Sequence, residues 1–236
     1  MTDYRDIERL FTEQLQLERR PVAIALLDEA RDDVPRFNGT VPSACTFWRL
    51  ASEGRVFSAA ANDHHNCPIG AYTHNIDLPS ERAGELTDTL GLMANIGYIR
   101  MEEVPSIPRL SKSPAAVVYA PLGETPVDPD VVLFMGRPGI LMRLQEAAAR
   151  AGIAAQMNTL GRPTCMAVPA TLQSGLTAST GCIGNRVYTD LDDSELYVAA
   201  PGSAIVPLSR EVQTIATANA TLLEYHTNRR RELLAV

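Results

Sequence analysis

Short, almost wholly apolar runs alternate along the chain with longer segments in which apolar side chains recur every three or four positions. The short runs are typical of strands buried on both faces, and the longer segments of helices that bury one face. Strands are predicted at residues 21–27, 55–60, 114–120, 130–135, 153–157, 176–180 and 195–200. Helices are predicted at residues 3–18, 44–53, 80–95, 139–151 and 207–230, with a brief one around residue 165. This alternation predicts an α/β or α+β fold with a central mixed sheet.

The order of elements in the first half of the chain recurs in the second half. The strand at 114–120 is similar to the strand at 21–27. Each is followed by a helix that carries a cysteine and then by a Gly-containing loop with a second cysteine. We therefore expect two similar, interlocked halves in one compact domain, with chance similarity as the alternative because the identities are few. The expected parts are one domain over residues 1–236, halves at about 20–100 and 113–200, and a terminal helix at 207–230.

Histidine and cysteine gather in the segment 61–75. Three of the four histidines and one of the four cysteines fall within it. Pro68 and Gly70 predict a loop here, and loops held by a rigid scaffold are common places for binding and catalytic sites. The segment that starts at Cys67 is similar to the one that starts at Cys182, which is a second sign of an internal repeat.

The composition argues against nucleic acid and membranes as partners. The net charge is −7 and the pI about 5.1. The basic run Arg229–Arg231 suits the C-terminal end of a helix, where cations meet the helix dipole. No apolar run is long enough to span a bilayer, and the first residues lack the apolar core of a signal peptide. We expect a cytoplasmic protein whose cysteines are reduced.

Reduced cysteines are either buried packing residues or metal ligands. Thiolates bind zinc, copper(I) and iron–sulfur clusters. The wide spacing here lacks both the close Cys-x-x-Cys pairs of zinc fingers and the compact ferredoxin pattern, but it is compatible with a cluster whose ligands come from separate loops. The predicted metal ligands are Cys45, Cys67, Cys165, Cys182 and His65.

Cys45 and Cys165 are both predicted in the first turn of a helix, where unpaired N–H groups and the helix dipole stabilise a thiolate. Gly181 and Gly184 leave the backbone open to a bulky ligand. Arg186 suits a carboxylate or phosphate, with a structural salt bridge as the alternative. The predicted cofactor-binding residues are Gly70, Gly181, Gly184 and Arg186.

The histidines are predicted to differ in role. His65 lies two positions before Cys67, so on an extended segment both side chains share one side and His64 points toward solvent or a backbone carbonyl. His65 and His74 are the candidate proton-transfer residues, because an unperturbed imidazole titrates near neutrality. A histidine hydrogen-bonded to backbone is the alternative for each.

Several separated motifs resemble a known family. They are Pro21-Val-Ala-Ile24, Cys45 on its helix, Cys67-Pro-Ile-Gly70, Pro129-Asp-Val-Val-Leu-Phe134 and Gly181-Cys-Ile-Gly-Asn-Arg-Val-Tyr188. Together they resemble domain of unknown function family 169, which occurs in archaea and bacteria, over about residues 20–225. The resemblance implies that the cysteine-bearing segments are family features. It supplies no activity, and the histidines at 64, 65 and 74 match no pattern of that family.

Two classes of function fit these observations. The first is a metalloprotein with an iron–sulfur cluster bound by thiolates and a redox or small-molecule-converting role, with zinc or haem as other cofactors. The second is a metal-free module with structural cysteines, whose Gly-rich loops and Arg186 bind a small anionic molecule. The expected partner is a small molecule or a metal cofactor, and a homo-oligomer is compatible with either class. No nucleotide-binding motif is present in the sequence.

Overall fold

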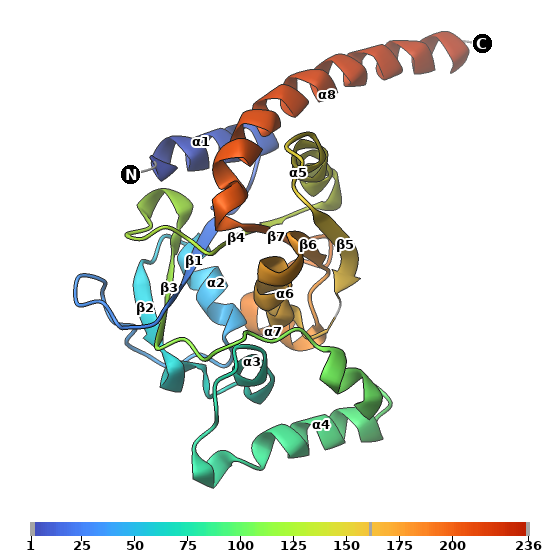
Figure 1. Cartoon of the computed structure of the whole chain (residues 1–236). Helices are drawn as coiled ribbons and strands as arrows, with labels where there is room; N and C mark the ends of the chain where they lie inside the picture. The colour runs from blue at the N-terminus through green and yellow to red at the C-terminus, as the bar shows by residue number, and fades with distance from the viewer. Residues whose placement is uncertain (1–2, 161, 235–236) are drawn as a thin grey trace.

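A seven-stranded sheet forms the centre of the molecule (Figure 1). The computed structural model describes residues 3–160 and 162–234. The strands are β1 (Val22–Leu27), β2 (Phe57–Ala60), β3 (Ala116–Pro121), β4 (Val131–Gly136), β5 (Ala155–Leu160), β6 (Leu176–Ser179) and β7 (Leu196–Pro201). Their order is β2-β3-β1-β4-β7-β6-β5, and only β5 and β6 pair in parallel. The predicted mixed sheet of an α/β protein is therefore confirmed.

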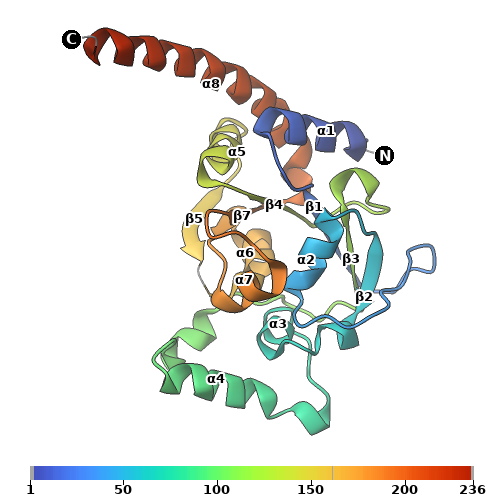
Figure 2. The ribbon, with the colours of Figure 1, turned by 180° about the vertical axis from the view of Figure 1, so that it is seen from behind.

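Helices cover both faces of this sheet (Figures 1 and 2). One layer holds α1 (Tyr4–Leu15), α5 (Pro138–Arg150) and α8 (Ile205–Leu234), and the other holds α2 (Cys45–Ser52) and α6 (Ala167–Ser174). Successive strand residues face opposite layers, so both must be apolar. In β7, for example, Tyr197 packs in the α2 layer and Val198 in the α1 layer. This explains why the strands read as continuous apolar runs.

Two stretches predicted as loops are short helices. α3 (Pro68–Thr73) and α7 (Ile183–Thr189) begin directly after Cys67 and Cys182, which are their N-cap residues. Pro68 occupies the first helical position, where its fixed φ and missing N–H suit the start of a helix. The loop prediction was wrong because proline was interpreted as a turn residue rather than as a helix start.

The helix predicted at 80–95 is divided. A 3-10 turn at Ser80–Arg82 precedes α4 (Glu85–Asn95), whose N-cap is Gly84 instead of Ser80. A longer 3-10 helix, Met101–Ser106, follows it. α4 packs against α3 rather than against the sheet, so this segment extends the α2 layer outward (Figure 1).

The strand order is symmetric about its central pair of strands. Outward from the central β1–β4 pair, β3 and β2 lie on one side and β7 and β6 on the other. Both β3 and β7 end in a proline followed by a 3-10 turn, at Leu122–Glu124 and Gly202–Ala204. The pairs of opposed residues also correspond, Val22–Pro121 with Val131–Pro201 and Phe57–Tyr119 with Thr177–Ala199.

This register changes how the halves are matched. The sequence comparison matched the strand at 114–120 with the strand at 21–27. In the structure the counterpart of β1 is β4, and the counterpart of β3 is β7, so the related segments are 22–121 and 131–201. Buried strands have similar apolar compositions, so local similarity selected the wrong pair.

The C-terminal part of α8 extends away from the body of the molecule (Figures 1 and 2). Arg229–Arg231 lie in this exposed part, as expected for a helix end. The helix begins at Ile205, slightly before the predicted start. None of the described helices is both long enough and apolar enough to cross a membrane.

Candidate functional site

All four cysteines line one cavity of about 630 Å³. Each sulfur comes from the start of a helix. Cys45 is the first residue of α2, and Cys165 lies in the 3-10 turn Thr164–Met166 that leads into α6. Cys67 and Cys182 are the N-caps of α3 and α7. Residues far apart in the sequence therefore meet at one place.

The cysteines occupy equivalent positions in the two halves. Phe57 follows Cys45 at the same sequence spacing as its counterpart Thr177 follows Cys165. Cys67 and Cys182 each cap the helix that follows the corresponding strand. The elements also cross between the halves, since α2 packs against α7 and the turn that carries Cys165 packs against α3. The repeat therefore explains how two pairs of thiols reach a common cavity.

Hydrogen bonds that involve the backbone hold three of the cysteines in place. The Gly70 N–H donates to Cys67 Sγ at 3.3 Å. The Cys165 thiol donates to the Ile69 carbonyl in a long contact of 3.9 Å, which joins the two halves. The Cys182 N–H donates to Thr164 Oγ1 at 2.5 Å.

Burial makes protonated thiols the stable form of the buried pair. It raises the pKa of Cys45 and of Cys165 well above the usual thiol range, and the neighbouring sulfurs raise both pKa values further. Burial also raises the pKa of Cys67, although the Gly70 N–H opposes the shift. The thiolates expected from the helix positions are therefore not favoured by the protein alone, because desolvation outweighs the helix dipole.

The sulfurs are close enough to influence one another but are not gathered around a single point. Within residues 3–160 and 162–234, no three His, Cys, Asp or Glu side chains are arranged to hold one metal ion. A tetrahedral zinc ion with Zn–S bonds of about 2.3 Å needs its sulfurs about 3.8 Å apart.

The positions of His64 and His65 are the reverse of those predicted: His64 points into the protein, and His65 does not face the cavity. Residues 61–64 form a 3-10 turn, so the extended geometry that placed His65 beside Cys67 is wrong. His64 is buried, with Nδ1 2.8 Å from the Ala60 carbonyl and Nε2 3.1 Å from the Tyr119 hydroxyl. His65 is half-buried and does not line the cavity.

His74 is buried in the protein interior rather than on the cavity wall. Its Nδ1 lies 3.0 Å from the Gly70 carbonyl, and its ring lies 5.7 Å from that of His64, centroid to centroid. Burial lowers the pKa of His64 to about 3 and also lowers the pKa of His74. Both imidazoles are therefore neutral packing groups near neutral pH.

The side chain of Arg186 is held by backbone carbonyl groups of its own region of the chain. Its guanidinium donates to the carbonyls of Asp192, Thr180 and Glu195, at 2.7, 2.5 and 3.1 Å. These bonds fix the turns on either side of α7 and leave Arg186 outside the cavity lining. The structure thus favours the structural alternative over anion binding.

The predicted glycines differ in what they do. Gly184 lines the cavity, and Gly70 presents its N–H to Cys67. Gly181 has φ +78°, and a Cβ there would lie 3.0 Å from Asn185 Oδ1. Gly181 is thus required by the backbone turn before α7.

Sequence reasoning missed the second wall of the cavity. The same cavity is lined by Leu90 and Met93 of α4, and by Ile99 and Ile107 around the 3-10 helix Met101–Ser106. The available signal was an amphipathic segment within the first half that matches no strand or helix of the second half.

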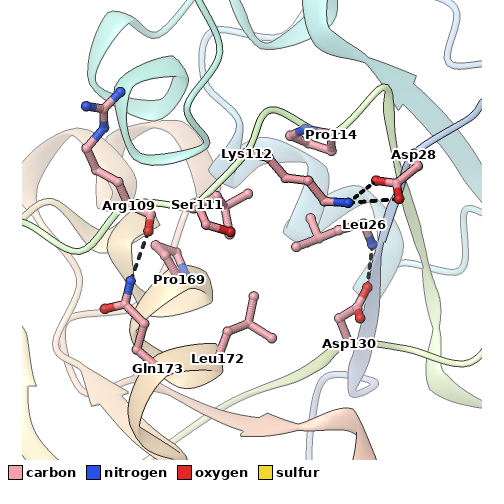
Figure 3. Close-up of a pocket in the computed structure, with 11 residues that line it drawn as sticks. Leu26, Asp28, Arg109, Ser111, Lys112, Pro114, Asp130, Pro169, Leu172 and Gln173 are labelled. Carbon is pink, nitrogen blue, oxygen red and sulfur yellow. Dashed lines mark hydrogen bonds and ion pairs between the residues drawn. The ribbon is translucent and has the colours of Figure 1, made fainter.

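A second cavity of about 410 Å³ lies at the end of β1 (Figure 3). Lys112 Nζ reaches across it to both carboxylate oxygens of Asp28, at 2.6 and 2.8 Å. Asp130 accepts the Leu26 N–H at 2.6 Å. None of the four cysteines lines this cavity, so the thiol chemistry is confined to the larger one.

Comparison with protein families matches residues 10–210 to domain of unknown function 169, described as "Uncharacterised ArCR". A relative, Uncharacterized protein MJ0308 of Methanocaldococcus jannaschii, is 27% identical over 213 residues, which cover 85% of this chain and 90% of the relative. No solved structure matches the chain significantly. These matches agree with the resemblance carried by the separated motifs.

Proposed function

This chain belongs to domain of unknown function family 169, and we propose that its four cysteines together hold an iron–sulfur cluster. The observation that carries the proposal is the convergence of two symmetry-related thiol pairs on one cavity. Four cysteine thiolates are the usual ligand set of both [2Fe–2S] and [4Fe–4S] clusters. The bound cluster would supply one-electron transfer to a partner or to a small molecule in the same cavity.

The arrangement of the thiols is the reason to propose a cluster rather than a single zinc ion. The thiols share a cavity, but no three of the described ligand-type side chains are arranged around one ion. In a cluster each cysteine binds a different corner or edge of a larger inorganic core, so its sulfurs stand farther apart than those around one zinc.

The electrostatics of the cavity make loading with iron depend on pH. Burial raises the pKa values of Cys45 and Cys165, and neighbouring sulfurs, among them those of Cys67 and Cys182, raise both further. Binding iron replaces the thiol protons and removes the repulsion between the sulfurs, so loading should release protons and weaken at low pH. The backbone N–H that already contacts Cys67 Sγ at 3.3 Å is the type of hydrogen bond that tunes bound clusters.

Anaerobic purification, followed by absorption and electron paramagnetic resonance spectra and by metal and sulfide analysis, tests this proposal. We expect a brown protein with broad absorption at the blue end of the visible spectrum and with labile sulfide. A sharp Soret band would assign haem instead. A colourless protein with stoichiometric zinc, or one that takes up neither iron nor sulfide on anaerobic reconstitution, would overturn the proposal.

A further inference from the structure

The thiol cavity has a second, apolar side. Its lining includes Leu90 and Met93 of α4, Ile99 and Ile107 from the following segment, and Met166 next to Cys165. The volume of about 630 Å³ lies within the range of small-molecule sites, which are mostly apolar with a few polar groups.

Apart from Met166, this wall belongs to a segment without a counterpart in the other half of the molecule. The chain runs through residues 74–115 between α3 and β3, whereas only residues 190–195 connect α7 to β7. The repeat alone would place the thiols in a symmetric setting. The extra segment gives the cavity an apolar side, which is typical of a site that binds a small molecule.

One cation stands on the cavity wall. Among the described lining residues, Arg162 is the only Arg or Lys and Glu103 the only Asp or Glu. Glu103 is shared, because it accepts from Arg100 at 2.9 Å and from Arg162 at 3.3 Å. One carboxylate thus serves two guanidinium groups. Arg162 also stacks on Tyr98, with its Cζ 4.9 Å from the ring centroid, which holds the guanidinium at the wall.

We infer that this cavity binds a small molecule with an aromatic or other apolar body and one anionic group, the body against α4 and the anion at Arg162. The inference rests on the proposed function in one respect: the proposed iron–sulfur cluster, bound by the thiols beside the molecule, would be its redox partner. It does not need the cluster for binding itself. Arg162 takes the role of the anion-binding residue that the sequence assigned to Arg186.

Isothermal titration calorimetry with 8-anilinonaphthalene-1-sulfonate tests the inference. Its uncharged analogue N-phenyl-1-naphthylamine shows how much of the affinity depends on the anionic group. The full chain, purified anaerobically, should bind the sulfonate at one site per chain. Leu90→Trp fills the cavity and should weaken binding by about tenfold or more. Leu92→Trp is the matched control, because Leu92 lies on the same helix but is 62% exposed, and should change affinity by less than about twofold.

Arg162→Gln is a second variant that does not depend on repacking the wall. It should weaken the sulfonate by about tenfold and leave the uncharged analogue unchanged. The inference would be overturned if the two Trp variants weakened binding equally, or if several weak sites per chain were found. It would also be overturned if Arg162→Gln bound each probe with the wild-type affinity. If a protein that takes up no iron binds the probes with the expected pattern, the small-molecule site is supported and the iron–sulfur cluster is rejected. If a protein loaded with the cluster does not bind the probes in this way, the cluster is supported and the small-molecule site is rejected.

Discussion

Individual histidines and cysteines differ here mainly through burial. His64 and His74 are enclosed in the core, where charging an imidazole is costly, and both are neutral. The thiols of Cys45 and Cys165 are protonated for the same reason, although each lies at the start of a helix. From the sequence, residue types and helix positions could be predicted, but the depth of burial depends on neighbours that only the fold supplies.

The buried His64 predicts how stability depends on pH. In the unfolded chain its imidazole takes up a proton near pH 6.5, but in the folded protein only near pH 3. Between these values the unfolded state binds the extra proton, so the free energy of unfolding falls as pH decreases, by about 1.4 kcal/mol per pH unit from this group. Urea unfolding from pH 6 to 4 should show a shallower slope in His64→Gln than in the wild type.

His226→Gln is the control for this measurement, because His226 is exposed on α8. It should keep the wild-type slope. If His64→Gln also retained that slope, His64 would not be the neutral, buried group described above.

Among the helices and strands, local pattern was sufficient for several elements that pack in the sheet or against it. β1, β4 and α5 were predicted within two residues at either end, because their apolar positions face a core. The short helices α3 and α7 were missed. They are too short for a periodic pattern, and their starts are marked only by a capping cysteine and, in α3, by Pro68.

Two glycines test the packing of elements in opposite directions. A Cβ on Gly202 would lie 1.6 Å from the Pro129 carbonyl oxygen, where the turn after β7 meets the start of β4. Gly202→Ala should therefore lower the free energy of unfolding by about 2–4 kcal/mol. Gly91 lies inside α4, and a Cβ there would meet no neighbouring side chain or element within 4 Å, so Gly91→Ala should raise stability by about 0.5–1 kcal/mol.

Chemical denaturation of both variants checks this pair, with circular dichroism as the probe of folded structure. A neutral Gly202→Ala variant would mean that the contact between the β7 turn and β4 is looser than described. A destabilised Gly91→Ala variant would mean that α4 is packed on the side of Gly91.

For the molecule as a whole, the sequence predicted a repeated unit and the convergence of its cysteines, but it could not predict the pairing of the halves. Strand order and register decide that β1 corresponds to β4. This information is non-local, whereas similarity between apolar strands is local and ambiguous. The apolar wall at α4 lies outside the repeat, so a comparison of the two halves gave no reason to place it over the thiols.

The most direct test of the central claim is the iron and labile sulfide content of Cys→Ser variants at each of the four cysteine positions. The wild type should contain equal amounts of both, about two or four per chain, and each single replacement should lower both by about half or more. Ser209→Ala, at a site in α8 on the opposite face of the sheet, should leave them unchanged. Iron that is absent from the wild type, or that persists when any of Cys45, Cys67, Cys165 and Cys182 is replaced, would contradict a shared four-thiolate site.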